Sequence, residues 1–215
     1  MRLTIIGATR GIGKALSEQA RAAGHHVVAV GRSLGPAAAD NLTHVRGSIL
    51  EEGVAEEALE RANAVAYCLG AGSYGPDVGK PVTIFSQSTE RLLDAMRARG
   101  VMRIGVITGV GSGDSRGHGG FLYDAVAMPF ALGAIYADKT RQEELLRASD
   151  RDWTVIRPVV LTHGPYTGTY RVLEDLTGFN GGTISRADCA DCLLRALAEH
   201  RWSRRAVAIT GGDGR

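Results

Sequence analysis

Short runs of β-branched and other apolar residues alternate with amphipathic stretches along all 215 residues of the chain. A continuous apolar run is typical of a strand buried on both faces, and the stretches between the runs have helical spacing. A strand followed by a helix, repeated along a chain, predicts a parallel sheet with helices on both faces. We therefore expect an α/β fold with one doubly wound, mostly parallel sheet over residues 1–215. The expected strands are 3–8, 25–32, 43–48, 64–70, 102–113, 153–162 with a break at Pro158, and 205–210; the expected helices are 13–24, 51–62, 82–100, 135–150 and 185–200.

Two segments interrupt this alternation, and we expect them to form the loops of a substrate site. Residues 109–134 and 164–183 are rich in glycine and mix polar with aromatic side chains. Each follows the carboxyl end of a predicted strand, which is where sheets of this kind bind their ligands. Long connections without regular structure of their own are commonly functional.

The composition excludes several classes of protein. A net charge of +2 is too small for a surface that binds nucleic acid or lipid. No apolar run is long enough to cross a bilayer or to form a secretory signal, so we expect a cytoplasmic protein with no nucleic-acid or membrane partner. Cys189 and Cys192 lie in a helical pattern without nearby histidines, and we interpret them as buried helix residues rather than as metal ligands.

The stretch LTIIGATRGIGKAL, residues 3–16, connects the first strand to the first helix through Gly7, Gly11 and Gly13. Gly7 permits a tight turn, Gly11 lets the backbone approach a pyrophosphate, and Gly13 lets the helix pack closely on the strand. The N–H groups at the start of the helix attract the phosphate charge. In this strand-to-helix context the glycines predict a Rossmann-type dinucleotide site.

Arginine in place of an acid at the end of the second strand indicates which dinucleotide the predicted site binds. Sites for NAD place a carboxylate there to bind the adenosine ribose, whereas this chain has Arg32, and Arg10 lies within the glycine loop. Two guanidinium groups near one ribose favour an anion between them. The 2′-phosphate of NADP is such an anion, so we favour NADP(H) as the cofactor.

The chain resembles the atypical short-chain dehydrogenases/reductases of the NAD(P)H-binding, NmrA-like group, and within it the flavin reductases of the biliverdin-IXβ type. Four stretches carry this resemblance: IIGATRGIG, YADKTRQEELLRASDRDWTVIRP, GPYTGTYRV and ISRADCADCLLRAL. The last three are more specific, because glycine motifs are shared by much larger groups.

The resemblance implies roles for individual residues. It assigns the phosphate loop to Gly7, Thr9, Arg10, Gly11, Ile12 and Gly13, and the 2′-phosphate contact to Arg32. It assigns the surroundings of the ribose and the nicotinamide to Leu69, Gly70, Thr108, Lys139, Pro158 and Val159. Thr108 and Lys139, with Tyr136, are also the candidate catalytic residues.

The chain departs from the family pattern at the proton donor. Short-chain dehydrogenases that act on alcohols and ketones use Tyr-x-x-x-Lys, and no tyrosine here has a lysine four residues later. Tyr136 and Lys139 are one residue short of that spacing, although positions i and i+3 share a helix face. The serine that flavin reductases carry near the nicotinamide aligns with Gly109. Thr108, Ser112 or Ser115 could replace it.

These departures favour a reductase of a planar acceptor. Hydride transfer to a carbonyl requires a positioned acid, whereas a flavin or quinone delocalises the charge and can take its proton from solvent. Two alternatives stay open: a protein that senses NADP(H) without catalysis, and a carbonyl reductase or epimerase that uses Tyr136 and Lys139. We expect a monomer or weak dimer.

Further side chains in the two loops are candidates for contacting the acceptor. The aromatic and apolar ones are Phe121, Tyr123, Met128, Phe130, Tyr166 and Phe179, and the histidines are His118 and His163. For each aromatic residue, packing on the sheet is the competing interpretation.

Overall fold

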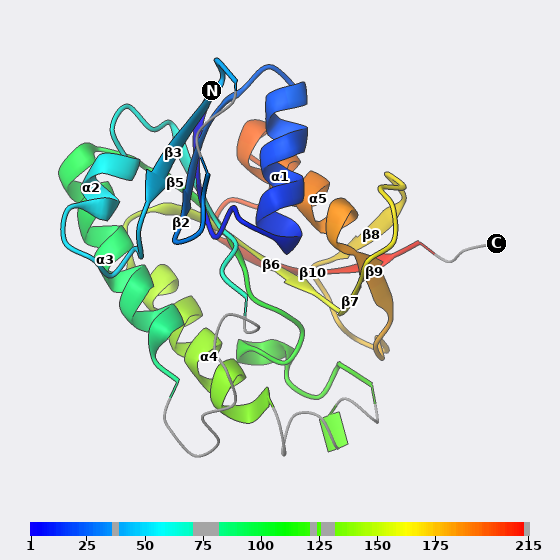
Figure 1. Ribbon diagram of the computed structural model, residues 1–215. Coiled ribbons are helices and arrows are strands. Elements are labelled where there is room, and N and C mark those ends of the chain that lie inside the picture. The colour runs from blue at the N-terminus through cyan, green and yellow to red at the C-terminus, as the bar shows by residue number, and fades with distance from the viewer. Residues whose placement is uncertain (36–38, 71–81, 121–123, 126–131, 213–215) are drawn as a thin grey trace.

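A large sheet flanked by helices organises the chain, as the computed structural model in Figure 1 shows for residues 1–35, 39–70, 82–120, 124–125 and 132–212. Its strand order is β3-β2-β1-β4-β5-β6-β10-β8, and β7 pairs with β9 in a second, two-stranded sheet. The strands are β1 (Arg2–Ile6), β2 (His26–Gly31), β3 (Leu42–Arg46), β4 (Ala64–Tyr67), β5 (Arg103–Ile107), β6 (Asp152–Pro158), β7 (Val160–Thr162), β8 (Tyr170–Leu173), β9 (Thr183–Ser185) and β10 (Arg205–Gly211).

Helices lie on both faces of this sheet (Figure 1). On one face are α1 (Gly11–Ala22) and α5 (Arg186–Ala198), and on the other are α2 (Val54–Ala58), α3 (Ile84–Arg99) and α4 (Gly133–Ala148). Every pairing in the large sheet is parallel except that of β10 with β8. The predicted α/β, doubly wound, mostly parallel fold is therefore confirmed.

The strand order reverses at β1, which is the point where a ligand crevice is expected. Ile6 at the end of β1 is aligned with Val30 of β2 on one side and with Tyr67 of β4 on the other. The three strands thus end at the same level. Consequently the glycine loop that follows β1 lies between the ends of its two neighbours.

Two apolar cores fill the space between the sheet and its helices. Leu3 and Ile5 of β1 pack toward Leu16 of α1 on one face, whereas Ile6 packs toward α3 on the other. Cys189 and Cys192 of α5 are fully buried in the first core, as we predicted, and burial raises the pKa of Cys192 to about 12.

The segment 164–183 is more regular than the sequence indicated, and this corrects our expectation of a loop throughout. β8 adds to the edge of the sheet antiparallel to β10, and β9 pairs with β7. Both strands are short, and most of their residues are exposed or half-buried, so they lack the apolar run by which the other strands were recognised. The break at Pro158 is confirmed, because β6 ends there and β7 pairs in the second sheet.

Replacing Gly13 with alanine tests the close packing of α1 on the glycine loop. A β-carbon at Gly13 would overlap the carbonyl oxygen of Gly7. We expect Gly13→Ala to lower the free energy of unfolding by about 1–3 kcal/mol in urea denaturation. Gly35→Ala is the matched control, because nothing lies within 4 Å of the added carbon. Equal stability of the two variants would contradict the prediction.

Candidate functional site

The glycine loop is a tight turn pressed against the end of β4. Gly7 has φ +85°, and a β-carbon there would lie 3.1 Å from the backbone of Cys68 and Leu69. The Gly7 and Ala8 amides donate to the carbonyl of Val30 at 3.1 and 3.3 Å, which ties the loop to β2. The start of α1 therefore opens at the edge of the sheet where the strands end, and its first N–H groups have no intrahelical acceptor.

Arg10 and Arg32 are both exposed beside this loop. Arg10 has an extended backbone and caps α1, and Arg32 follows β2 directly. The loop and the end of β2 touch, because a β-carbon on Gly31 would lie 2.6 Å from the methyl group of Thr9. Arg46 of β3 donates two hydrogen bonds to the carbonyl of Leu34 and so supports the turn that carries Arg32.

At the end of β5, the hydroxyl groups that the sequence singled out are engaged within the protein. Thr108 Oγ1 donates to Glu143 Oε1 of α4 at 2.8 Å, and Ser112 Oγ lies 2.6 Å from the same oxygen. Ser115 accepts from the Gly111 amide and donates to the Ser112 carbonyl. All three side chains are buried. Their hydrogen bonds fix the conformation of the loop that follows β5.

Glu143 is paired with Arg157 of β6, and both side chains are buried. Arg157 Nε lies 3.0 Å from Glu143 Oε1, and Nη2 bonds both Glu143 Oε2 and Asp114 of the loop after β5. Burial alone would lower the pKa of Arg157, but its hydrogen bonds and the charges of Glu143 and Asp114 raise it. Sequence reasoning missed Glu143. The sequence offered only a weak signal, which is the spacing of four residues between Lys139 and Glu143 that puts both on one helix face.

That inward face of α4 is polar along most of its length. Its buried residues are Asp138, Lys139, Gln142, Glu143 and Leu146. Asp138 accepts from the Phe85 amide and the Ser86 hydroxyl at the start of α3, and Gln142 donates to Thr89 at 2.8 Å. We refer to the four polar residues as the α4 polar stripe.

Lys139 and Tyr136 both reach the end of β5 from α4. Lys139 Nζ donates to the Ile107 carbonyl at 3.1 Å and lies 4.6 Å from the centre of the Phe85 ring. A β-carbon on Gly109 would lie 2.5 Å from the Tyr136 hydroxyl group, so this hydroxyl rests on the backbone just beyond β5. The structure thus brings the two candidate catalytic side chains to neighbouring positions of one strand end. Thr108 lies between those positions.

The remaining predicted cofactor residues lie along the same edge of the sheet. Leu69 is half-buried and Gly70 exposed after β4. Pro158 and Val159 are buried at the end of β6, where the Pro158 carbonyl accepts from the Val110 amide at 3.0 Å. Ile12 is buried in the first turn of α1.

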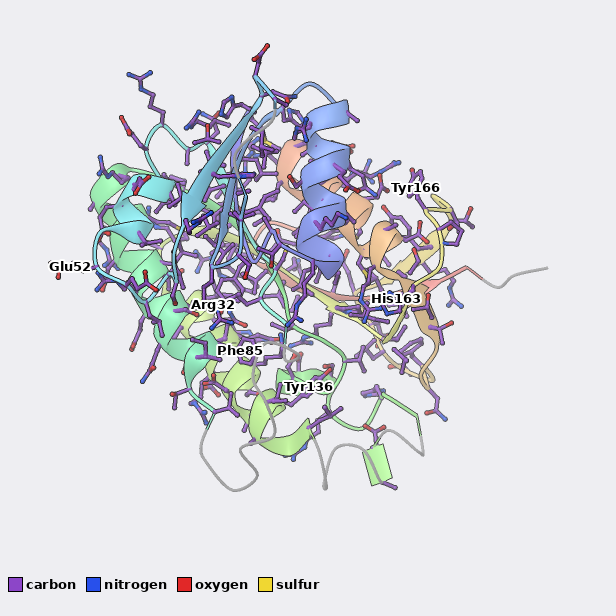
Figure 2. All side chains as sticks on the ribbon, in the orientation of Figure 1. Arg32, Glu52, Phe85, Tyr136, His163 and Tyr166 are labelled. Carbon is purple, nitrogen blue, oxygen red and sulfur yellow. The ribbon has the colours of Figure 1, made fainter. Side chains whose placement is uncertain are left out.

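The candidate acceptor contacts divide into three groups. Phe121, Tyr123, Met128 and Phe130 lie outside the described residues. Figure 2 places His163 on the same edge as Arg32 and Tyr136, and Tyr166 apart from them, where its hydroxyl lies near Gly168. Phe179 packs partly against the core.

The described parts of the two predicted loops contact each other. The Gly181 amide donates to the carbonyl of His118 at 3.0 Å, and His118 Nδ1 donates to the Phe179 carbonyl at 3.3 Å. Two adjoining hollows of about 420 and 270 Å³ lie beside this junction and share Leu173, Asp175 and Thr177. The two segments therefore form one wall beyond the end of β10.

The part of the chain that the structure describes contains neither a cluster of metal-binding side chains nor a membrane-spanning helix. No three histidine, cysteine, aspartate or glutamate side chains are grouped as metal ligands would be. None of the described helices combines the length and the apolar character needed to cross a membrane.

Comparisons with known proteins relate this site to a family. The model of a family described as NAD(P)H-binding matches residues 7–200. A Bacillus subtilis (strain 168) protein, named as the uncharacterized sugar epimerase YhfK, is 29% identical over 166 residues, which are 75% of this chain and 71% of that protein.

Two solved structures share the fold over nearly their whole length. ChuY, an anaerobillin reductase from Escherichia coli O157:H7, has a TM-score of 0.81 at 22% identity, over 100% of this chain and 99% of its own. SP1627 from Streptococcus pneumoniae TIGR4, provisionally named an NADH-flavin reductase, has a TM-score of 0.78 at 24% identity, over 99% and 100%. The doubly wound architecture is common to all three proteins.

Removing the charge of Glu143 is expected to destabilise the protein strongly. Glu143→Gln leaves the buried Arg157 guanidinium without its buried counter-ion, and we expect a loss of about 3–5 kcal/mol in the free energy of unfolding. Asp114→Asn, at the exposed partner of the same arginine, is the control, with an expected loss below about 1 kcal/mol. Urea denaturation measures both. Similar losses would show that the buried pair is not the dominant interaction.

Because Lys139 is buried, we expect the free energy of unfolding to depend on pH. Burial lowers the pKa of Lys139 from 10.5 to about 8, against the opposing charges of Glu143 and Asp138. Between these two values the unfolded chain keeps a proton that the folded protein has lost, so stability rises with pH in this window. The free energy of unfolding of the wild type should increase from pH 8 to 10.5 relative to that of Lys139→Met. If the free energies of unfolding of the wild type and of Lys139→Met changed in parallel with pH, the lowered pKa of Lys139 would be disproved.

Proposed function

Because this chain belongs to the NAD(P)H-binding family, we propose that it is an NADPH-dependent reductase of the atypical short-chain dehydrogenase/reductase group, with a planar acceptor such as a flavin or quinone. When bound, the nicotinamide supplies the hydride. The observation that carries the proposal is the hydrogen bonding at the end of β5. There Thr108 and Ser112 donate to Glu143, and Lys139 donates to a backbone carbonyl.

The glycine loop fits a dinucleotide. A side chain at Gly7 or Gly13 would meet backbone atoms, so the loop keeps close to the strand ends and leaves the first turn of α1 available to a pyrophosphate. Leu69, Gly70, Pro158 and Val159 lie along the neighbouring strand ends, in the direction in which an extended dinucleotide continues.

The preference for NADPH rests on Arg10 and Arg32. Both are exposed at the adjacent ends of the glycine loop and of β2, where the adenosine ribose binds in this fold. A 2′-phosphate would receive hydrogen bonds from both guanidinium groups and would relieve their mutual repulsion. The name of the streptococcal protein specifies NADH, so the proposed preference is argued from these two arginines and not from that protein.

A planar acceptor suits a site without a dedicated proton donor. The acceptor would lie over the end of β5, between the α4 side chains and the wall of the two loops, and orientation would provide most of the rate enhancement. The reduced flavin or quinone would take its proton from solvent. A cytoplasmic location and a monomeric or weakly dimeric state remain predictions from the sequence.

Tyr136 supports a second candidate function. Its hydroxyl rests on Gly109 beside Lys139, and the Bacillus subtilis relative is named as a sugar epimerase. A Tyr136 phenol that exchanges a proton with a carbonyl or sugar substrate would make this protein a carbonyl reductase or an epimerase.

Turnover with NADPH and NADH, with FMN and small quinones as acceptors, tests the proposal. We expect NADPH to be the better substrate. Arg32→Ala should lower kcat/KM for NADPH by on the order of 10- to 100-fold and leave NADH unchanged, because only NADPH carries the 2′-phosphate. Arg99→Ala, at the exposed end of α3, is the matched control.

The other functions give different results in the same assay. Tyr136→Phe should leave turnover with planar acceptors nearly unchanged. Loss of turnover in this variant would favour the second candidate function, a carbonyl reductase or an epimerase. Tight NADPH binding without turnover on any acceptor would identify a redox sensor instead. Binding of neither nucleotide would refute the dinucleotide site itself.

A further inference from the structure

Arg186, the first residue of α5, was not among the cofactor residues implied by the sequence. Its side chain is half-buried and crosses the end of β7. Nη1 donates to the Thr162 carbonyl at 2.9 Å and lies 3.4 Å from that of Leu161. These bonds hold the guanidinium group at the end of β7, in the second sheet.

The same side chain lies against the glycine loop. A β-carbon on Gly11 would be 3.8 Å from Arg186 Cδ and 3.9 Å from Nε, which is ordinary van der Waals contact. α1 and α5 pack side by side (Figure 1), and Gln19 Nε2 donates to the Ala187 carbonyl at 2.9 Å. The position of Arg186 relative to the first turn of α1 is therefore set by the packing of the two helices.

The positive charges around Arg186 favour a bound anion. The starts of α1 and α5 both carry the positive end of a helix dipole, and Arg10 caps α1. Within the described residues, no carboxylate is within ion-pair distance of Arg186. Asp188, the acid in the first turn of α5, instead accepts hydrogen bonds from Thr167, Gly168 and Ser185.

We propose that Arg186 binds the pyrophosphate of the dinucleotide from the α5 side of the glycine loop; this inference rests on the proposed cofactor site. Nη1 stays on the β7 carbonyls, and Nε, which lies beside Gly11, and Nη2 are the donors left for the phosphate groups. Arg186 then differs in kind from Arg32. Its ligand is a group that NADPH and NADH share, so it contributes to affinity and not to the choice between them.

Binding measurements on Arg186→Gln and Arg186→Ala test this assignment. Glutamine keeps a donor for the Thr162 carbonyl but removes the charge. The dissociation constants of NADPH and NADH should both rise by about tenfold, whereas that of 2′-AMP, which has no pyrophosphate, should not change. Arg32→Ala should give the opposite pattern, with weaker NADPH and 2′-AMP and unchanged NADH.

The control is Arg195→Ala on the same helix, where the arginine pairs with Asp191. Melting temperatures without nucleotide verify that the variants are folded, and Arg186→Gln serves if the alanine variant is not. Unchanged affinity for both dinucleotides, or a loss for NADPH alone, would overturn the role of Arg186. Wild-type protein that binds neither dinucleotide would overturn the proposed function together with this inference.

Discussion

The buried ion pair of Arg157 and Glu143 is the interaction on which the site depends. It joins β6 to α4, and Glu143 Oε1, which accepts from Arg157 Nε, also accepts hydrogen bonds from Thr108 and Ser112 at the end of β5. Two charges withdrawn from water are stable only if their remaining hydrogen-bonding capacity is satisfied. The loop after β5 supplies some of those partners, and its glycines adopt the positive φ angles that this shape requires.

The α4 polar stripe extends the same principle along the helix. An amphipathic helix usually packs through an apolar face, but here each inward polar residue is hydrogen-bonded to a neighbouring element: Asp138 and Gln142 to α3, Lys139 to β5, and Glu143 to β6 and the loop after β5. Hydrogen bonds have direction, so such an interface allows only one register of the helix on the sheet. That register delivers Tyr136 and Lys139 to the end of β5 together.

The sequence predicted the layers of the fold and the glycine loop, because apolar runs and glycine spacing are local properties. β8 and β9 escaped prediction since their partners, β10 and β7, are distant in the chain and their own residues show no apolar alternation. The partnership of Glu143 with Arg157 was hidden for a similar reason. Charged residues on a helix are ordinarily solvated, and only the fold reveals which are buried. The position of Arg186 beside the glycine loop could not be predicted from the sequence, because it depends on the packing of α5 against α1.

The junction between His118 and the segment Phe179–Gly181 has a consequence for how a protein with the proposed reductase function could change its acceptor. The Gly181 amide donates to the His118 carbonyl and so joins the backbones of two distant segments, and a length change in one would displace the other. Side chains other than that of His118, whose Nδ1 donates to the Phe179 carbonyl, can be exchanged without disturbing these bonds. Diversification of the acceptor should therefore proceed through substitutions on a wall of constant shape, and insertions in one loop should require matching insertions in the other.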